Sequence, residues 1–214
     1  MAEPRYIAIE GVTGVGKTGL AKLLAQRLDA RLLLERIENN PFLGKFYASP
    51  SKYAFHTQLF FLIDRYRQQQ ELRQLDLFHQ LVISDYLFNK DKIFAYLNLD
   101  EHELALYERL LSLIETDIRR PDLVIYLQAS TEKIIRRIAS RGTDIDLVAP
   151  PDYIRALNEA YNSFFFHYDE TPLLVVNTSE VDLTYDPRDL DDLIEQILEP
   201  HAGTRYYVPM VDRK

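Results

Sequence analysis

"YIAIEGVTGVGKTGLAKLLAQRL", residues 6–28, joins a short apolar run, a glycine-rich loop and an amphipathic segment. The β-branched run 6–10 predicts a buried strand, and Leu20, Leu24 and Leu28 share one face of a predicted helix. Between them lies the pattern G-x-x-x-x-G-K-T, which consists of Gly11, Val12, Thr13, Gly14, Val15, Gly16, Lys17 and Thr18. In such a P-loop, backbone N–H groups surround a nucleotide's phosphates, the lysine bridges the β and γ phosphates, and the threonine hydroxyl ligates Mg²⁺. We therefore expect residues 11–18 to bind the phosphates of a nucleotide.

The composition indicates a globular protein. Of the 214 residues, 47% are apolar and 27% are charged, and cysteine is absent. The sequence has no apolar run long enough to cross a membrane and no signal-peptide pattern, so we expect a cytoplasmic protein without a membrane partner. The formal charge of −8 argues against binding to a nucleic-acid polymer. The length, and the lack of a linker or repeat, predict one domain over residues 1–214.

Short apolar runs alternate with longer helical patterns along the chain. The predicted strands are residues 6–10, 31–35, 81–85, 122–128 and 172–177. Helical patterns cover residues 19–28, 42–74 with a break near ASPSK, 86–118 with a capping aspartate at Asp100, 130–141, 149–170 and 186–199. This alternation predicts an α/β fold of the P-loop NTPase type, with a five-stranded parallel sheet flanked by helices.

Two carboxylates stand where predicted strands end. Glu35 ends the run 31–35 and Asp85 ends the run 81–85, so both are expected at the same edge of the sheet as Gly11. Glu35 is placed to accept a proton from an attacking hydroxyl, and Asp85 to hold Mg²⁺, directly or through water, together with Thr18. The guanine-specific N/TKxD motif is absent, and no strand ends in the DE pair of an ATPase motor. The pattern therefore favours a kinase over a switch GTPase or a motor.

The segment FHTQLFFLIDRYRQ, residues 55–68, places polar side chains on an aromatic helix surface. Gln58 and Arg65 are seven residues apart, which puts them on one helix face. Both side chains are suited to hydrogen-bonding the edge of a base while a ring stacks on it. The alternative is that both are ordinary polar residues of a surface helix.

Several longer stretches resemble the deoxyribonucleoside kinases, and within that family the bacterial deoxyguanosine/deoxyadenosine kinase branch. They are YIAIEGVTGVGKT, LLLERIENNPFLGKFY, FHTQLFFLIDRYRQ, ISDYLFNKDKIFA, PDLVIYLQAS, RRIASRG and LNEAYNSFFFHYDETPLLVVNT, which together extend over nearly the whole chain. The resemblance implies a nucleoside/thymidylate kinase-like fold with a short arginine-bearing lid at residues 137–150. It also implies an enzyme that transfers phosphate from ATP, with Mg²⁺, to a deoxyribonucleoside.

The resemblance assigns roles around the acceptor. Glu35 corresponds to the base that activates the nucleoside 5′-hydroxyl, and Gln58 and Arg65 match the positions that read the base edge. Asp91 corresponds to the acidic partner of Arg65, and Phe94 to the ring that packs on the base. Substrate contacts are therefore expected from two segments. One follows Glu35 and contains Gln58 and Arg65, and the other follows Asp85 and contains Asp91 and Phe94.

Further roles fall on the sugar and the lid. Tyr47 and Asp146 correspond to residues on the sugar 3′-hydroxyl, where close packing near C2′ would disfavour a ribose. Arg137 and Arg141 correspond to lid arginines that clamp the transferred phosphate. Together with Lys17 they are expected to stabilise charge on that group during catalysis. Their i, i+4 spacing independently puts both on one helix face, as a phosphate clamp requires, and a solvated basic face is the alternative.

Three positions depart from the family pattern. Many relatives carry Arg-Ser after the strand-end acid, whereas Asp85 is followed by Tyr86 and Leu87, so one positive charge near the phosphates is missing. Thr143 stands where a further lid arginine is common, and Asp146 replaces the more usual glutamate, which shortens its reach to the sugar. The first departure is also typical of the bacterial purine branch, so it does not indicate loss of activity.

These residues together predict a deoxynucleoside 5′-kinase of nucleotide salvage. The Arg65/Asp91 pair favours a base with both donor and acceptor on its edge, and purine deoxynucleosides are expected as substrates. Deoxycytidine is the second possibility and thymidine the last. The aromatic helices 54–66 and 101–117 also predict a homodimer. Two rivals remain open: a nucleoside monophosphate kinase of the thymidylate type, which needs an arginine for the acceptor's own phosphate, and a non-catalytic nucleotide-dependent switch.

Overall fold

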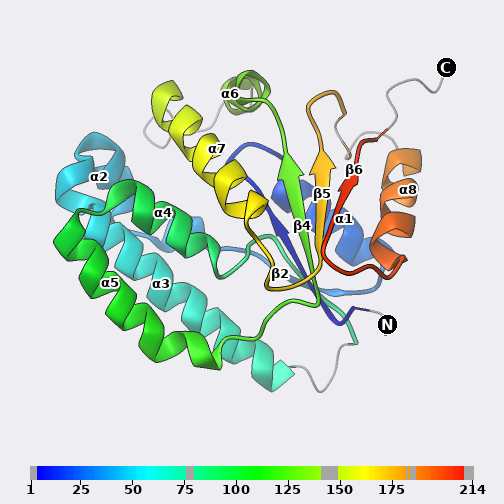
Figure 1. Cartoon of the computed structure of the whole chain (residues 1–214), viewed down its shortest axis with the longest axis horizontal. Coiled ribbons are helices and arrows are strands. Elements are labelled where there is room, and N and C mark those ends of the chain that lie inside the picture. Colours follow the sequence, from blue (N-terminus) through cyan, green and yellow to red (C-terminus); the bar gives the residue numbers. More distant parts are fainter. Residues whose placement is uncertain (1–3, 76–79, 141–148, 182, 184–186, 210–214) are drawn as a thin grey trace.

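The centre of the molecule is a sheet of parallel strands. The computed structural model describes residues 4–75, 80–140, 149–181, 183 and 187–209 (Figure 1). Within them, six strands pair in the order β2-β3-β1-β4-β5-β6, and every pair is parallel. They are β1 (Tyr6–Glu10), β2 (Arg31–Leu33), β3 (Val82–Ser84), β4 (Leu123–Gln128), β5 (Leu173–Asn177) and β6 (Thr204–Tyr207). The predicted α/β fold with a parallel sheet is confirmed, and all five predicted strands are present.

The sixth strand, β6, was not predicted. Its four residues alternate between exposed and half-buried, and they pair with the edge of β5, with Tyr207 opposite Val176. A run this short carries a weak strand signal, and its pairing depends on an edge that β5 provides from far away in the sequence. The C-terminal segment therefore extends the predicted sheet by one strand.

β1 and β4 form the buried centre of the sheet. All residues of β1 are buried, as are all residues of β4 except Gln128. Ile7 of β1 pairs with Ile83 of β3 on one side and with Leu123 of β4 on the other. Such strands are apolar on both sides because helices cover both faces of a parallel sheet. The exception is Glu10, a fully buried acid at the end of β1.

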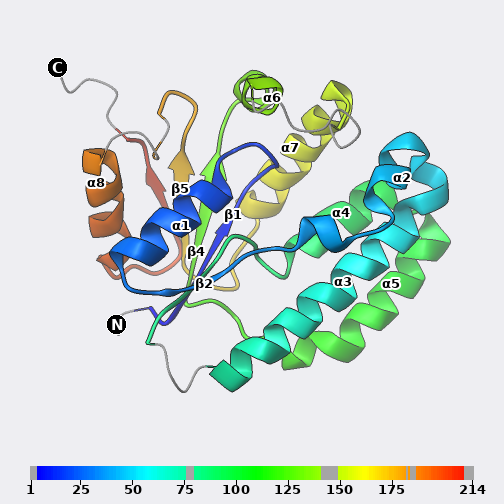
Figure 2. The same ribbon diagram turned by 180° about the vertical axis from the view of Figure 1, so that it is seen from behind.

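Helices cover both faces and one side of the sheet. In the described residues they are α1 (Lys17–Arg27), α2 (Leu43–Ala48), α3 (Pro50–Leu75), α4 (Lys90–Asn98), α5 (Glu101–Ile114), α6 (Thr131–Ser140), α7 (Pro151–Phe166) and α8 (Pro187–Leu198), with 3₁₀ turns at Ile37–Asn39 and Glu115–Asp117. α7 crosses one face in Figure 1, and α1 covers the opposite face in Figure 2. Arg27 of α1 bonds Asp191 of α8, while α2 to α5 form a group on the side away from α8 (Figures 1 and 2).

Local sequence signals set several helix boundaries. The predicted capping aspartate, Asp100, accepts hydrogen bonds from the backbone N–H groups of His102 and Glu103, both at 2.9 Å. The Glu103 carboxylate in turn accepts from the backbone N–H of Asp100, which completes a capping box. The break predicted near ASPSK falls at Ser49, which precedes Pro50 and is therefore disfavoured from helical geometry.

The group formed by α3, α4 and α5 has a small core of its own. Its buried apolar side chains are Leu62, Phe88, Ala95, Tyr107 and Leu111. This core lies apart from the main one between the sheet and its helices. It fixes α3 and α4 next to each other, and these two helices carry the predicted base-reading residues.

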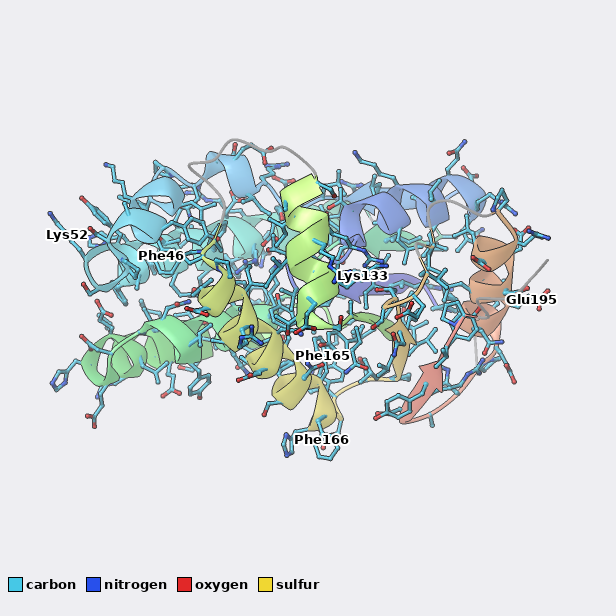
Figure 3. The ribbon with its side chains drawn as sticks, turned by 90° about the horizontal axis from the view of Figure 1, so that it is seen from above. Phe46, Lys52, Lys133, Phe165, Phe166 and Glu195 are labelled. Atoms are coloured by element: carbon cyan, nitrogen blue, oxygen red, sulfur yellow. The ribbon has the colours of Figure 1, made fainter. Side chains whose placement is uncertain are left out.

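The carboxyl ends of the strands meet at one edge, which Figure 3 views from above with α6 and α7 crossing it. The P-loop follows β1, Asp85 follows β3, and Glu35 follows shortly after β2. This edge is where ligands of open parallel sheets bind. In the part of the chain that the structure describes, no helix combines the length and the apolar character needed to cross a membrane.

Candidate active site

The P-loop connects β1 to α1 in a shape that needs its glycines. Gly11 and Gly14 have φ angles of 152° and 89°, values that favour glycine. A Cβ at Gly11 would lie 2.6 Å from the carbonyl oxygen of Leu127 on β4. One at Gly14 would lie 2.6 Å from Cγ1 of Ile138 on α6. The loop backbone therefore packs directly on β4 and on the helix that leads into the predicted lid.

Lys17, the first residue of α1, turns its ammonium back toward the loop. Nζ donates to the Gly11 carbonyl at 2.6 Å and lies 3.9 Å from Oε1 of Glu10. Burial lowers the pKa of Lys17, and the nearby Glu10 carboxylate opposes that shift. The result is a cation held at the loop, where phosphate charge would need to be neutralised.

Thr18 and Asp85 bring two hard oxygen ligands together beside the loop. The Thr18 hydroxyl donates to Oδ2 of Asp85 at 2.6 Å, and Oδ1 of Asp85 accepts from the backbone N–H of Glu35 at 2.7 Å. The described residues contain no cluster of three or more His, Cys, Asp or Glu that could hold a metal ion. A pair of oxygen ligands suffices for Mg²⁺, because it takes its remaining ligands from water and from the phosphates of a nucleotide.

Glu35 is held between two buried cations. Its Oε1 accepts from Nε and Nη2 of Arg65 at 2.9 and 2.6 Å, and its Oε2 accepts from Nζ of Lys90. Burial alone would raise the pKa of Glu35, but the Lys90 and Arg65 cations outweigh burial and lower that pKa to about 2. Glu35 is therefore ionised at neutral pH, and hydrogen bonds on both oxygens fix its orientation.

Arg65 extends this arrangement from Glu35 to Asp91 on α4. Its Nη1 donates to Oδ1 of Asp91, whose Oδ2 accepts from the Tyr107 hydroxyl at 2.9 Å. Gln58 donates from Nε2 to the backbone carbonyl of Asp91 at 2.8 Å. The structure thus brings together the three side chains that the resemblance assigns to the base edge, and all three are buried.

The aromatic residues assigned to the base and the sugar lie on α4 and α2. The ring of Phe94 on α4 stands perpendicular to that of Tyr161, with 6.1 Å between their centroids. Tyr47 on α2 packs edge-on against Tyr153 of α7 at 6.1 Å. The other residue assigned to the sugar, Asp146, lies outside the described residues.

Of the predicted lid, residues 137–140 at the end of α6 and residues 149–150 are described. Arg137 donates from Nη1 to the Val15 carbonyl of the P-loop at 3.1 Å. Its Nη2 donates to the carbonyls of Thr178 and Val181 at 2.8 and 3.1 Å. The guanidinium therefore ties α6 to the P-loop and to the segment after β5. The predicted lid residues Arg141 and Thr143 lie outside the described part of the chain.

Two charged residues of the site were not predicted. Lys90 begins α4 and is buried, although it lies in the polar and charged run NKDK, whose pattern gives no sign of burial. Glu10 accepts from the backbone N–H groups of Gly11 and Leu87 at 2.8 and 2.9 Å. Its signal was available, because an acid that ends an otherwise apolar strand is expected to be buried and bonded.

A cleft of about 600 Å³ opens next to these residues. Thr18, Glu35 and Asp85 line one part of it, and Arg36 and Glu71 line another. A phosphate-binding loop, a pair of metal-type oxygens and an ionised acid thus meet beside an open cleft. Together they define a P-loop phosphotransferase, in which Glu35 bonds Arg65 of α3 and Lys90 of α4 beside the cleft.

Comparison with known proteins gives the particular family. The family model described as "Deoxynucleoside kinase" matches residues 7–201, so the chain belongs to the deoxynucleoside kinase family. It is an enzyme that uses ATP to phosphorylate deoxynucleosides.

Individual relatives match over most of their length. Deoxyguanosine kinase of Bacillus subtilis (strain 168) is 35% identical over 83% of this chain and 86% of its own. Deoxyadenosine/deoxycytidine kinase of the same strain is 29% identical over 89% of this chain and 90% of its own. The structure of deoxyadenosine kinase from M. mycoides with bound dATP superposes with a TM-score of 0.76, at 27% identity, over 92% of this chain and 100% of that one. The predicted resemblance is therefore confirmed.

Proposed function

We propose that this deoxynucleoside kinase transfers the γ-phosphoryl group of ATP to the 5′-hydroxyl of a purine deoxynucleoside. The buried group of Gln58, Arg65 and Asp91 offers both donors and acceptors to a base edge, which supports a nucleobase as the group that it binds. The edges of purines and pyrimidines all present both, so the choice of a purine rests on the similarity to a deoxyguanosine kinase. The names of the Bacillus subtilis relatives, a deoxyguanosine kinase and a deoxyadenosine/deoxycytidine kinase, support this order, with deoxycytidine as the second candidate.

Glu35 is the proposed base for the acceptor hydroxyl. The 5′-oxygen forms a bond to the γ-phosphorus, the bond from that phosphorus to the bridging oxygen of ADP breaks, and the hydroxyl proton passes to Glu35. Because the pKa of Glu35 is about 2, the carboxylate is a weak base in the ground state. Its first role is to orient the hydroxyl, and the proton moves late, when the oxygen has begun to bond to phosphorus.

Thr18 and Asp85 are the proposed Mg²⁺ ligands, and the bound ion would offset charge on the β and γ phosphates. Lys17 supplies a second positive charge from the loop, as its ammonium already lies at Gly11. Asp85 also contacts the backbone of Glu35, so the donor and acceptor halves share one carboxylate.

The remaining assignments are proposals on the substrate and the lid. Phe94 packs on the base, and Tyr47 with Asp146 contacts the sugar 3′-hydroxyl. Arg137 and Arg141 contact the transferred phosphate, over a lid at residues 137–150 of a single domain. For Arg137 this requires that its guanidinium leave the carbonyls to which it is bonded.

A nucleoside monophosphate kinase is the nearest rival. It would need a cation for the acceptor's own phosphate, and Arg36 is the basic residue that flanks Glu35 in the sequence. Arg36 is about half exposed and pairs with the equally exposed Glu71 at 3.6 Å. Its charge is already paired in this way, so a deoxynucleoside is the favoured acceptor.

Two properties of the whole protein belong to the same proposal. Exposed apolar side chains on α5, Leu106 and Leu113, support a homodimer formed through that helix. A reaction that consumes ATP in nucleotide salvage also fits a cytoplasmic enzyme.

A substrate panel tests the proposal. Purified protein is incubated with labelled ATP and Mg²⁺ plus each deoxynucleoside, ribonucleoside or deoxynucleoside monophosphate. We expect a purine deoxynucleoside to have a kcat/KM at least about tenfold above deoxycytidine and about a hundredfold above thymidine. Phosphorylation of monophosphates alone would show that the protein is a monophosphate kinase. With Glu35→Gln, we expect kcat to fall by about 10²–10⁴ while ATP still binds.

A further inference from the structure

Lys90 is a buried ammonium that the roles assigned so far leave unused. It is the first residue of α4 and only 3% exposed. Its Nζ bonds Oε2 of Glu35, lies 3.9 Å from Oε2 of Glu10, and sits 6.0 Å from the centroid of the Tyr86 ring. A lysine is rarely buried unless its charge is paired, so these two carboxylates keep it at this position.

Lys90 occupies the middle of a chain of alternating charges. In order, the chain runs Lys17, Glu10, Lys90, Glu35, Arg65 and Asp91. Each member has at most 13% of its side chain exposed. The chain begins at the P-loop and ends at the base-reading residues, and Lys90 contacts one carboxylate on the donor side and one on the acceptor side.

Glu35 carries one negative charge but pairs with two cations, Arg65 and Lys90. Arg65 also contacts Asp91, and in the proposed function these two residues turn to the edge of the substrate base. When Arg65 bonds the base edge instead of Glu35, Oε1 of Glu35 becomes available to the 5′-hydroxyl. Lys90 then remains as the cation that compensates Glu35, because it bonds the other oxygen.

From this geometry, and on the basis of the proposed function, we propose that Lys90 is a positioning residue of phosphoryl transfer. It fixes Oε2 of Glu35 so that Oε1 faces the 5′-hydroxyl. When the hydroxyl proton passes to Glu35, that carboxylate loses its charge. Because Lys90 bonds the other oxygen, it holds the carboxylate in place before and during this step.

The residues before Lys90 explain why the cation comes from α4. Tyr86 and Leu87 follow Asp85 directly, but both side chains are buried in the main core and carry no positive charge. The backbone N–H of Leu87 bonds Glu10, which directs the start of α4 toward the end of β1. Lys90 is thereby placed beside both acids.

The first test compares Lys90→Met with Lys90→Arg and with a control, Lys92→Met. Lys92 is partly exposed and pairs with Glu115, away from the site. We expect Lys90→Met to lower kcat by about 10²–10³ and to change KM for the deoxynucleoside by less than about threefold. Lys90→Arg keeps the charge and should recover at least about a tenth of the activity. Lys92→Met should behave like the wild type.

The split between kcat and KM separates positioning from a merely structural role. Loss of a structural contact would also weaken binding of the deoxynucleoside, whereas loss of the cation that fixes Oε2 of Glu35 should lower kcat and leave KM nearly unchanged. Lys90→Arg should raise kcat back toward the wild-type value at the same KM. A Lys90→Met enzyme with wild-type kcat, or one in which KM rises as much as kcat falls, would overturn the proposal.

A double-mutant cycle covers the case in which Lys90→Met does not fold. Lys90→Met/Glu35→Gln removes both charges of the pair and avoids a buried carboxylate that has lost this partner. If Lys90 acts through Glu35, the added Lys90→Met change should cost less than about threefold in kcat relative to Glu35→Gln alone. A loss as large as in the wild-type background would overturn the role. A wild-type enzyme that phosphorylates only monophosphates would instead contradict the proposed function, so the two failures are distinguishable.

Discussion

At the scale of single residues, Glu35 combines two demands that oppose each other. The base proposed for the acceptor hydroxyl should bind a proton readily. Arg65 and Lys90 nevertheless favour the charged form and lower the pKa of Glu35 to about 2. The same cations keep a buried carboxylate oriented at the end of the sheet. The structure therefore favours orientation and electrostatic compensation over basicity, which suits phosphoryl transfer because most of its charge develops on the phosphoryl oxygens.

This pKa has a consequence for stability. Since the pKa of Glu35 is lowered by folding, its contribution is fully present above the unfolded value of 4.5 and is lost as pH falls toward about 2. Between pH 6 and pH 3 we expect Glu35 to account for a loss of about 2 kcal/mol in the free energy of unfolding. Urea unfolding at several pH values measures this loss.

The matched variant for this measurement is Glu35→Gln. It removes the titrating group, so its free energy of unfolding should fall by about 2 kcal/mol less than that of the wild type over the same pH interval. Parallel pH dependences of the two proteins would show that Glu35 has an ordinary pKa in the folded state.

At the scale of elements, the α5 capping box allows a test that leaves the site untouched. Asp100 accepts two backbone hydrogen bonds at the start of the helix and is exposed. Asp100→Ala should lower the free energy of unfolding by about 1 kcal/mol, and Asp100→Asn should retain most of the wild-type stability. Thermal unfolding measures both. A change in kcat in Asp100→Ala would mean that α5 affects the site through α4, contrary to expectation.

The elements also show where sequence reasoning was sufficient. The P-loop, Glu35 and Asp85 could be predicted because each follows a strand, and parallel strands bring their ends to one edge. Lys90 and β6 could not be predicted from the sequence, and the reason is the same for both. The burial of Lys90 depends on how α4 starts against β1, and β6 depends on the free edge of β5. Both are set by tertiary packing that local patterns do not contain.

At the scale of the whole molecule, α3 to α5 share a core of their own, and α5 also exposes large apolar side chains. Leu106 and Leu113 of α5 are 49% and 75% exposed, and their spacing of two helical turns puts them on one face. Large apolar side chains gathered in this way are typical of an interface between copies of a chain.

We therefore expect a dimer in solution that Leu106→Glu/Leu113→Glu converts to a monomer, because the variant would place two carboxylates in the apolar interface. The control is Phe166→Glu at the end of α7, since Phe166 is 78% exposed but lies well away from α5 (Figure 3). Light scattering after size-exclusion chromatography gives the mass of each protein. Because both substitutions fall on exposed side chains of α5, the monomeric variant should keep kcat within about threefold of the wild type. A wild-type monomer would contradict the dimer, and a double variant that stays dimeric would place the interface on another face.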